Sequence, residues 1–213
     1  MKRRFFSSAL VSSAAWLCTL PAWAQYAFKA GKDYLQLDRP VATEAGPGKI
    51  ELIEFFWYSC PHCNDFEPSF AQWIKKAPKD VVVRRVPVAF RDDFAPQQRL
   101  YYTLEAMNLL DSLHAKVFHA VHVERLPLKT DAAILAWVEK QGVDAARFGE
   151  TFKSFGVASK VRRAKQLQDE FRVEGVPSLG VTGKYYTDGS LAGGMDRALK
   201  VAESLIAQSR TGR

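Results

Sequence analysis

The sequence predicts an α/β fold in which an all-helical segment interrupts a unit of strands and helices. Three observations support this prediction. An apolar, strand-favouring run at 50–57 leads directly into a CxxC motif, and a helix-favouring run and a second strand at 81–88 follow. From about 94 to 171 the chain favours helix, and its apolar residues recur at helical spacing. Strand-like sequence then returns at 176–186.

The part of the α/β unit before the helical segment also contains a leading extended segment, predicted at 34–37. The run at 50–57 is apolar apart from two glutamates, which suits a buried central strand. The helix after the CxxC motif is expected at 61–77. Pro61 suits its first turn, where a missing N–H removes no helical hydrogen bond, and Pro68 predicts a kink.

Helices fill the inserted segment. We expect them around 100–110 and 117–121, and at 132–140, 144–155 and 158–171. Two of these are each led by an aspartate, Asp131 or Asp144, that is expected to cap the helix.

After the helical segment, the sequence predicts a hairpin and a final helix. Residues 176–181 and 184–186 form the two strands, with the turn at Thr182 and Gly183. The last helix is expected at 195–208. These elements complete the α/β unit.

The first 24 residues have the pattern of a signal peptide. Basic residues at 2–4 precede an apolar stretch at 5–20, and Ala22 and Ala24 are the small residues before a cleavage site at Gln25. The alternative is a membrane anchor, but the apolar run is short for a span. The leader holds three cations and no acid, so its removal lowers the formal charge from +7 to +4. That charge is too small to indicate nucleic-acid binding.

Cysteine usage indicates thiol chemistry. Cys18 lies in the leader, so the mature chain is expected to keep two cysteines, Cys60 and Cys63. Exported proteins commonly contain dispersed structural disulfides, whereas a CxxC between a strand and a helix is typical of redox catalysis. Two alternatives remain open. One is half of a zinc site, although four ligands are usual, and the other is an inert structural disulfide.

The spacing of the motif predicts different roles for its members. At the start of a helix, the sulfur of Cys60 faces unpaired backbone N–H groups and the positive end of the helix dipole, which lowers its pKa. Cys63, one turn later, is expected to resolve a mixed disulfide. Protonated His62 adds positive charge beside the thiolate. The Pro61-His62 pair therefore indicates an oxidising disulfide, because an easily leaving thiolate makes its disulfide a strong oxidant.

The motif and its surroundings resemble the DsbA family of periplasmic disulfide oxidases. The resemblance is carried by Glu-Phe-Phe-Trp-Tyr-Ser-Cys-Pro-His-Cys at 54–63, Phe66-Glu67 behind it, and Gly175-Val176-Pro177 downstream. It implies a periplasmic protein with a thioredoxin-like domain interrupted by an inserted all-helical domain. The expected boundaries are 25–93 and 172–213 for the thioredoxin-like domain and 94–171 for the insertion.

The resemblance also implies roles for individual residues. Pro177 is expected to be a cis-proline facing the cysteines, so that the backbone around Val176 can pair with an extended substrate. Glu54 is expected to be a buried acid that assists proton movement at Cys63; the alternative is a salt-bridged or solvated glutamate. Arg85 stands where related members have a lysine. Arginine stays charged, so it can pair with Glu54 but cannot release a proton.

The function implied is a thiol:disulfide interchange enzyme that donates the Cys60–Cys63 disulfide to reduced, newly exported polypeptides. A quinone-linked membrane protein of the DsbB type is expected to reoxidise it. We expect a monomer that uses no metal or other cofactor besides the cysteine pair and binds no nucleic acid. The alternatives are a periplasmic disulfide reductase or isomerase, and a chaperone-like module that binds peptides without using its cysteines.

Two further residue groups have simpler interpretations. His114, His119 and His122 cluster in one predicted helix, and the i, i+3 spacing of the last two suits a metal, although a packed or solvated helix is the expected reading. The tryptophans at 57, 73 and 137 are expected to be core residues.

Overall fold

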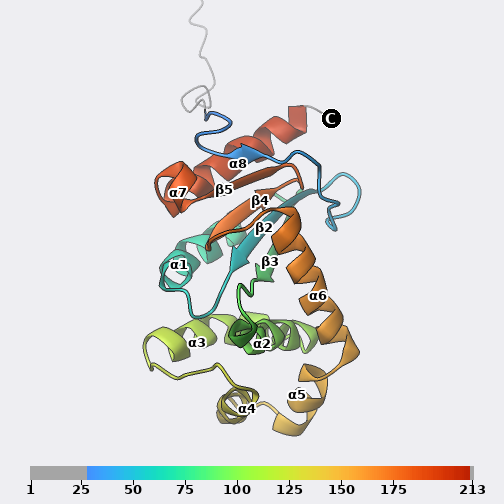
Figure 1. Cartoon of the computed structure of the whole chain (residues 1–213), viewed down its shortest axis with the longest axis vertical. Helices are drawn as coiled ribbons and strands as arrows, with labels where there is room; N and C mark the ends of the chain where they lie inside the picture. The colour runs from blue at the N-terminus through green and yellow to red at the C-terminus, as the bar shows by residue number, and fades with distance from the viewer. Residues whose placement is uncertain (1–27, 212–213) are drawn as a thin grey trace, which may run out of the picture.

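The computed structural model describes residues 28–211, so the expected signal peptide at 1–24, with Cys18, lies outside the described residues. Within 28–211, five strands form one mixed sheet in the order β1-β5-β4-β2-β3, which occupies the upper half of Figure 1. The strands are β1 Leu35–Gln36, β2 Ile50–Phe56, β3 Val81–Pro87, β4 Ser178–Val181 and β5 Tyr185–Asp188. β2 pairs in parallel with β3 and antiparallel with β4.

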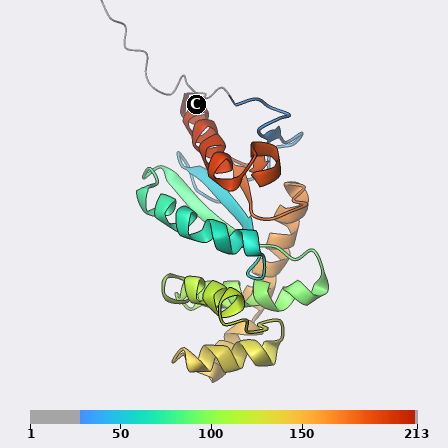
Figure 2. The same cartoon turned by 90° about the vertical axis from the view of Figure 1, so that its left-hand side faces the viewer.

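Helices flank the sheet and form the lower half of the molecule (Figures 1 and 2). They are α1 Pro61–Lys76, α2 Ala95–Ala106, α3 Leu110–His122, α4 Asp131–Lys140, α5 Ala145–Phe152, α6 Phe155–Glu170, α7 Gly189–Ala192 and α8 Met195–Thr211, with a 3-10 turn at Asp92–Phe94. The chain leaves the sheet after β3, runs through α2 to α6, and returns at β4. This arrangement confirms the predicted α/β fold with a helical insertion.

β2 lies between β3 and β4 and is buried along its whole length. Alternate residues of a strand point to opposite faces of the sheet. Ile50 and Leu52 belong to a core that they share with α1 and α8. Ile53 and Phe55 belong to a second core, which continues into the helical segment. The strand therefore joins both halves of the hydrophobic interior.

Polar and aromatic contacts fasten the helical segment to the sheet. The buried amide of Gln98 on α2 donates to the carbonyl oxygen of Pro87 at 2.8 Å. The buried Gln168 on α6 accepts from a backbone N–H just beyond β3 at 3.2 Å. Phe171, directly after α6, lies against β4, where its ring leaves no room for a side chain at Gly180. Both ends of the insertion are thus held in fixed positions beside the strands.

The first helix boundary that differs from prediction separates α2 from α3. The apolar spacing predicted helix throughout 100–110, but α2 ends at Ala106 and α3 begins at Leu110. Asn108 has a φ of 57°, a left-handed conformation that ends an α-helix.

Helix caps account for the other differences. The hydroxyl of Thr130 accepts from the N–H of Ala133, so Thr130 caps α4 and the expectation that Asp131 does so was wrong. Asp144 caps α5 as predicted, accepting from a backbone N–H at 3.0 Å. The helix predicted at 144–155 ends at Phe152, and the helix predicted at 158–171 begins earlier, at Phe155, because Ser154 caps α6.

The predicted hairpin forms between β4 and β5 and turns at Thr182 and Gly183, whose φ angles are 55° and 66°. Positive φ at both central residues is the geometry of a tight hairpin turn. β4 begins at Ser178, directly after a cis Val176–Pro177 peptide bond. The short helix α7 was not predicted. Among the residues that the structure describes, no helix is long and apolar enough to cross a membrane.

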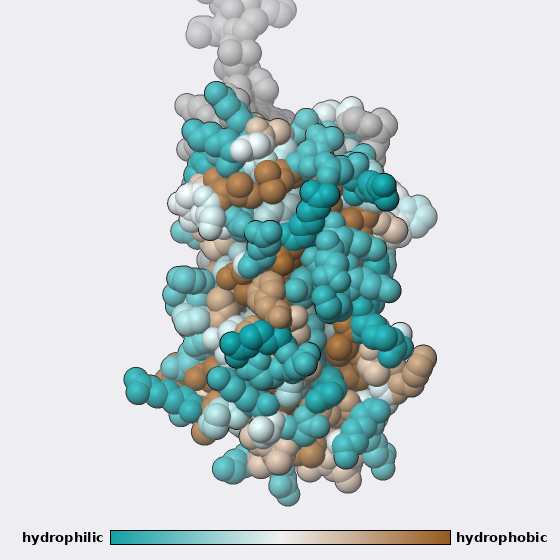
Figure 3. Space-filling model, viewed as in Figure 1, coloured by the Kyte–Doolittle hydropathy of each residue, from teal (hydrophilic) through white to brown (hydrophobic). Residues whose placement is uncertain are grey.

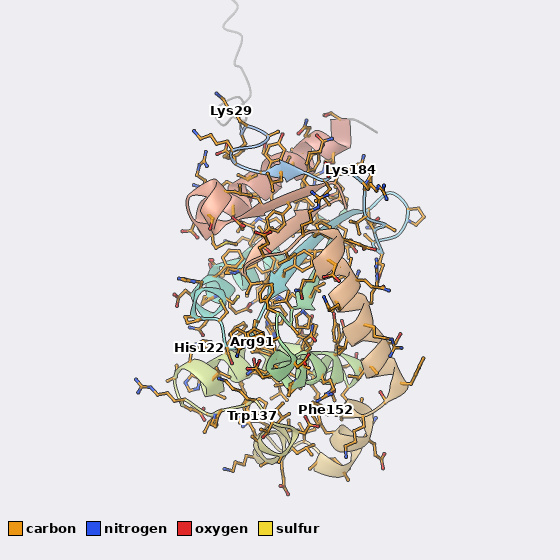
Figure 4. All side chains as sticks on the ribbon, in the orientation of Figure 1. Lys29, Arg91, His122, Trp137, Phe152 and Lys184 are labelled. Atoms are coloured by element: carbon orange, nitrogen blue, oxygen red, sulfur yellow. The ribbon has the colours of Figure 1, made fainter. Side chains whose placement is uncertain are left out.

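The three tryptophans lie in different surroundings. Trp137 is buried in the lower, all-helical part of the molecule, as predicted, and Figure 4 shows it there with Phe152. Trp57 and Trp73 are only half-buried, which corrects the expectation for both. Trp57 stacks on Phe94 with ring centroids 3.7 Å apart. Trp73 donates its indole N–H to Glu203 on α8.

Candidate active site

Cys60 is the N-cap residue of α1, immediately after the loop that follows β2. Its backbone is extended, with φ −84° and ψ 118°. The first N–H groups of the helix have no helical carbonyl to bind, and they point toward the cap residue. Cys60 is 8% exposed and Cys63 is fully buried. Cys60 lies at the start of the helix, as predicted, and its side chain is mostly enclosed by protein.

The surroundings of the two cysteines shift their pKa values in opposite directions. A hydrogen bond from the Cys63 thiol lowers the pKa of Cys60 to about 6, with help from the backbone N–H groups of Cys63 and His62 and the charge of His62, against the effect of burial. Burial raises the pKa of Cys63, and the neighbouring Cys60 sulfur and the Glu54 charge add to that effect. Cys60 is therefore the thiolate and Cys63 the thiol at neutral pH.

The segment before β4 lies against Cys60. The sulfur of Cys60 is 3.4 Å from the carbonyl oxygen of Val176, to which it can donate a hydrogen bond when it is protonated. Pro177 follows in cis geometry. The structure thus brings the CxxC motif and the Val-Pro pair together, although Cys60 and Val176 are 116 residues apart in the sequence.

Two hollows border the exposed side chain of His62. One, of about 350 Å³, is lined by Val176, Pro177, Gly189 and Met195 among others. The other, of about 650 Å³, is also lined by Met195 and reaches Arg197 on α8, with Phe66 and Lys200 in its wall. On the face seen in Figure 3, hydrophobic residues come to the surface in the middle of the molecule, between the sheet and the helices below. Open space therefore surrounds the His62 side chain, two residues after Cys60.

Glu54 lies in β2 and is 1% exposed. Burial raises its pKa to about 8, although the positive charge of Arg85 opposes this shift. The guanidinium of Arg85 contacts two carboxylates: Nε is 3.1 Å from Glu54 and an Nη is 2.8 Å from Glu67 on α1. Glu54 is therefore buried, as the family resemblance implied, and it is also salt-bridged to Arg85, as the alternative interpretation had it.

Sequence reasoning assigned no role to the residues that hold the loop between β2 and Cys60. The buried Tyr58 hydroxyl lies 2.8 Å from Nδ1 of His114 on α3. His122, at the end of α3 (Figure 4), donates its Nε2–H to the backbone carbonyl of Tyr58 at 2.8 Å. The amide of Gln97 on α2 donates to the hydroxyl of Ser59 at 2.8 Å. The one feature of the sequence that pointed to these contacts was the cluster of histidines at 114, 119 and 122.

The three histidines of α3 have separate partners. His114 is buried against Tyr58, His122 binds a backbone carbonyl, and exposed His119 pairs with Glu124 at 3.0 Å. In residues 28–211 no group of three or more ligand-type side chains is arranged to hold a metal ion. The histidines therefore support the loop and a neighbouring turn.

Comparison with known proteins agrees with this geometry. A family model described as a DSBA-like thioredoxin domain matches residues 85–205. A thiol:disulfide interchange protein DsbA of Bordetella parapertussis is 43% identical over 211 residues, covering 99% of this chain and 100% of that protein. This chain belongs to the DsbA family. The DsbA of Pseudomonas aeruginosa is 39% identical over 183 residues, 86% of each chain.

Solved structures of the DsbA family share the fold. The crystal structure of Pseudomonas aeruginosa DsbA covers 87% of this chain and 96% of its own, with a TM-score of 0.83 and 38% identity. The oxidoreductase DsbA from Xylella fastidiosa gives a TM-score of 0.80 at 27% identity, covering 87% of this chain and 100% of its own. The fold is therefore thioredoxin-like, and the chain is a thiol:disulfide oxidoreductase that acts through a cysteine pair.

The opposite pKa shifts predict selective alkylation of the reduced protein. At pH 6.5, with too little iodoacetamide to modify every thiol, the reagent should modify Cys60 and spare Cys63. Only a thiolate reacts quickly, and Cys63 remains a buried thiol. Peptide mass spectrometry identifies the modified residue. Cys60→Ser is the control and should lose nearly all labelling. Preferential labelling of Cys63 would overturn the assignment.

Proposed function

We propose that this protein donates the Cys60–Cys63 disulfide to reduced, newly exported polypeptides. The position of Cys60 at the N-terminus of α1 is the observation that supports this direction of electron flow. With a pKa of about 6, Cys60 is a thiolate at neutral pH in the reduced protein. Stabilising that thiolate stabilises the reduced form, so the disulfide has a strong tendency to accept two electrons.

The proposed reaction begins when a substrate thiolate attacks the sulfur of Cys60. The Cys60–Cys63 bond breaks, the Cys63 sulfur leaves with the electron pair and takes up a proton, and a mixed disulfide joins Cys60 to the substrate. A second substrate thiolate then attacks the substrate sulfur of this bond. Cys60 leaves as a thiolate, the substrate gains a disulfide, and the enzyme is left with two reduced cysteines.

The other site residues are proposed to assist these two steps. Glu54, protonated near neutral pH, supplies the proton that the Cys63 sulfur needs when it leaves. The backbone of Val176 pairs with the extended substrate chain beside Cys60, and Pro177 shapes the groove. Pro61 starts the helix without an unused N–H, and His62 adds positive charge beside the Cys60 thiolate.

The remaining proposals concern setting and partners. We place the enzyme in the periplasm as a monomer, after removal of residues 1–24, with the helical domain at 94–171 inserted between 25–93 and 172–213. Reduced exported polypeptides are the substrates, and a DsbB-type membrane protein reoxidises the cysteines.

The proposed function predicts a specific pair of variant phenotypes. The oxidised protein should form disulfides in a reduced, unfolded polypeptide, and Cys60→Ser should abolish this activity because the attacked sulfur is gone. Cys63→Ser has no disulfide to donate, but when it is mixed with a polypeptide that already contains a disulfide, its Cys60 thiolate should attack that bond and displace one substrate thiolate. The Cys60–substrate mixed disulfide should then accumulate, since no neighbouring thiol of the enzyme can resolve it. Both are measured by thiol titration and non-reducing gels. The chaperone-like alternative is favoured if the wild-type protein does not oxidise the polypeptide and the Cys60→Ser variant still suppresses its aggregation.

The pKa of Cys60 also predicts how stability depends on pH. The folded pKa of about 6 lies below the unfolded value of about 8.5, so the thiolate stabilises the reduced form fully above pH 8.5 and this contribution is lost as pH falls through 6. From pH 5 to pH 8, the reduced form should gain about 2–3 kcal/mol of unfolding free energy relative to the oxidised form. The raised pKa of Cys63 opposes the gain only at higher pH.

Urea denaturation of both redox forms at pH 5 and pH 8 measures this gain. The oxidised form is the internal control, because it contains every other titrating group but no thiol at 60 or 63. A difference between the two forms that stays constant over this range contradicts a stabilised Cys60 thiolate.

A further inference from the structure

A buried cluster of charged side chains joins the sheet to the helical segment beside the cysteine pair. β2 contributes Glu54, α1 contributes Glu67, β3 contributes Arg85 and α3 contributes His114. Both glutamates and His114 are at most 8% exposed. The mechanism proposed above uses Glu54 and gives His114 no part beyond its contact with Tyr58.

The charges of this cluster do not balance when both carboxylates are ionised. One guanidinium, on Arg85, faces the carboxylates of Glu54 and Glu67. Burial lowers the pKa of His114 and so favours the neutral imidazole. A net negative charge in the interior is costly, so near neutral pH the cluster retains one dissociable proton. That proton lies on Glu54, on Glu67 or on His114.

The contacts distinguish the two carboxylates. Glu67 accepts a hydrogen bond from Arg85 at 3.0 Å and also faces Nε2 of His114 at 3.5 Å. Among the described residues, Glu54 forms one ion pair, which is with Arg85. Glu67 therefore has two cationic or N–H partners where Glu54 has one.

The contact with Tyr58 orients the imidazole of His114. When the Tyr58 hydroxyl donates to Nδ1 at 2.8 Å, the proton of the neutral ring must reside on Nε2, which faces Glu67. The other ionisable groups around the ring are Arg85 and Tyr101 on α2, whose ring centroid is 5.8 Å away. Phe56 and Phe118 enclose the ring from β2 and α3. Tyr58 thus sets the tautomer that donates toward Glu67.

We propose that His114 is a positioning residue that keeps Glu67 ionised and thereby leaves the dissociable proton of the cluster on Glu54. It acts through Glu67 and does not touch the reacting sulfurs. The pKa directions agree with this assignment. Burial raises the pKa of Glu54 to about 8, whereas for Glu67 the effect of burial is outweighed by His114 and Arg85, so its pKa is lowered. Resting on the proposed function, this inference explains why the proton is available to Cys63, whose pKa the Glu54 charge affects.

Carboxyl titration by NMR tests the proposal directly. Protein labelled with ¹³C at glutamate carboxyl carbons is titrated in the oxidised form, where neither cysteine ionises, and Glu54→Gln and Glu67→Gln assign the two resonances. In wild type, Glu54 should titrate near 8 while Glu67 stays ionised throughout the neutral range. In His114→Leu, Glu67 should gain a titration step at neutral to alkaline pH, a rise of roughly three units or more, as burial of a carboxyl group can produce.

Matched variants separate this role from simple packing. His114→Gln keeps an N–H for Glu67 and an acceptor for Tyr58, so it should restore the wild-type titration. His119→Leu alters an exposed residue of the same helix and should change neither carboxyl. If Glu67 remains ionised in His114→Leu, the proposal is wrong.

A measurement on the wild-type protein does not depend on whether the leucine variant folds. The ¹⁵N shifts of His114 should show a neutral ring, with the proton on Nε2, from pH 5 to pH 8. If His114 itself titrates there as Glu54 ionises, the histidine carries the proton and the proposal fails. These titrations involve no redox reaction, so the same samples can also be assayed for polypeptide oxidation. The role of His114 and the proposed oxidase function can therefore fail independently of each other.

Discussion

The position of one sulfur atom at the start of α1 determines most of the chemistry of this protein. β2 is buried along its length and ends one short loop before Cys60, so the strand fixes where the helix begins. The N-cap position gives the Cys60 sulfur the backbone N–H groups of Cys63 and His62, while for Cys63, one turn later, the effect of burial outweighs its backbone contact with Trp57. One sulfur is therefore stable as a thiolate and the other as a thiol, and the proposal that substrates attack Cys60 rests on this asymmetry.

The helical segment holds the loop that leads to Cys60 and does more than cover the sheet. α2 and α3 bind the loop that carries Cys60: Gln97 holds Ser59, and His114 and His122 hold the side chain and backbone of Tyr58. The loop is thus held between the sheet and the insertion. A substitution in α3 can change the chemistry of the cysteines without touching them, because the same helix reaches both the loop and the buried ion cluster.

Sequence was sufficient for features that depend on near neighbours in the chain. The strand, the CxxC motif and the helix follow one another directly, and the turn at Thr182 and Gly183 has a local signal, so these were predicted within a few residues. The cap of α4 was assigned to Asp131 instead of Thr130, since both residue types cap helices and only the structure shows which side chain accepts. Features assembled from distant segments were harder. The contact between Cys60 and Val176 was expected through family resemblance alone.

The buried ion cluster shows most clearly what sequence could not supply. His114 was read together with His119 and His122 because they share a helix, but each faces a different neighbour, and which neighbour depends on how α3 packs on the sheet. Pairing of Glu54 with Arg85 was anticipated, yet the sharing of Arg85 with Glu67 was not. Such an arrangement requires four elements to converge, and no local pattern records it.

The reduction potential of the Cys60–Cys63 pair tests the central claim most directly. It is measured by equilibrating the protein with glutathione buffers at pH 7 and quantifying the two redox forms. A stabilised Cys60 thiolate predicts a potential less negative than about −180 mV, the value of protein disulfide isomerase. A potential near about −270 mV, that of the reductant thioredoxin, would contradict the account, because the folded protein would then favour its disulfide over its thiolate.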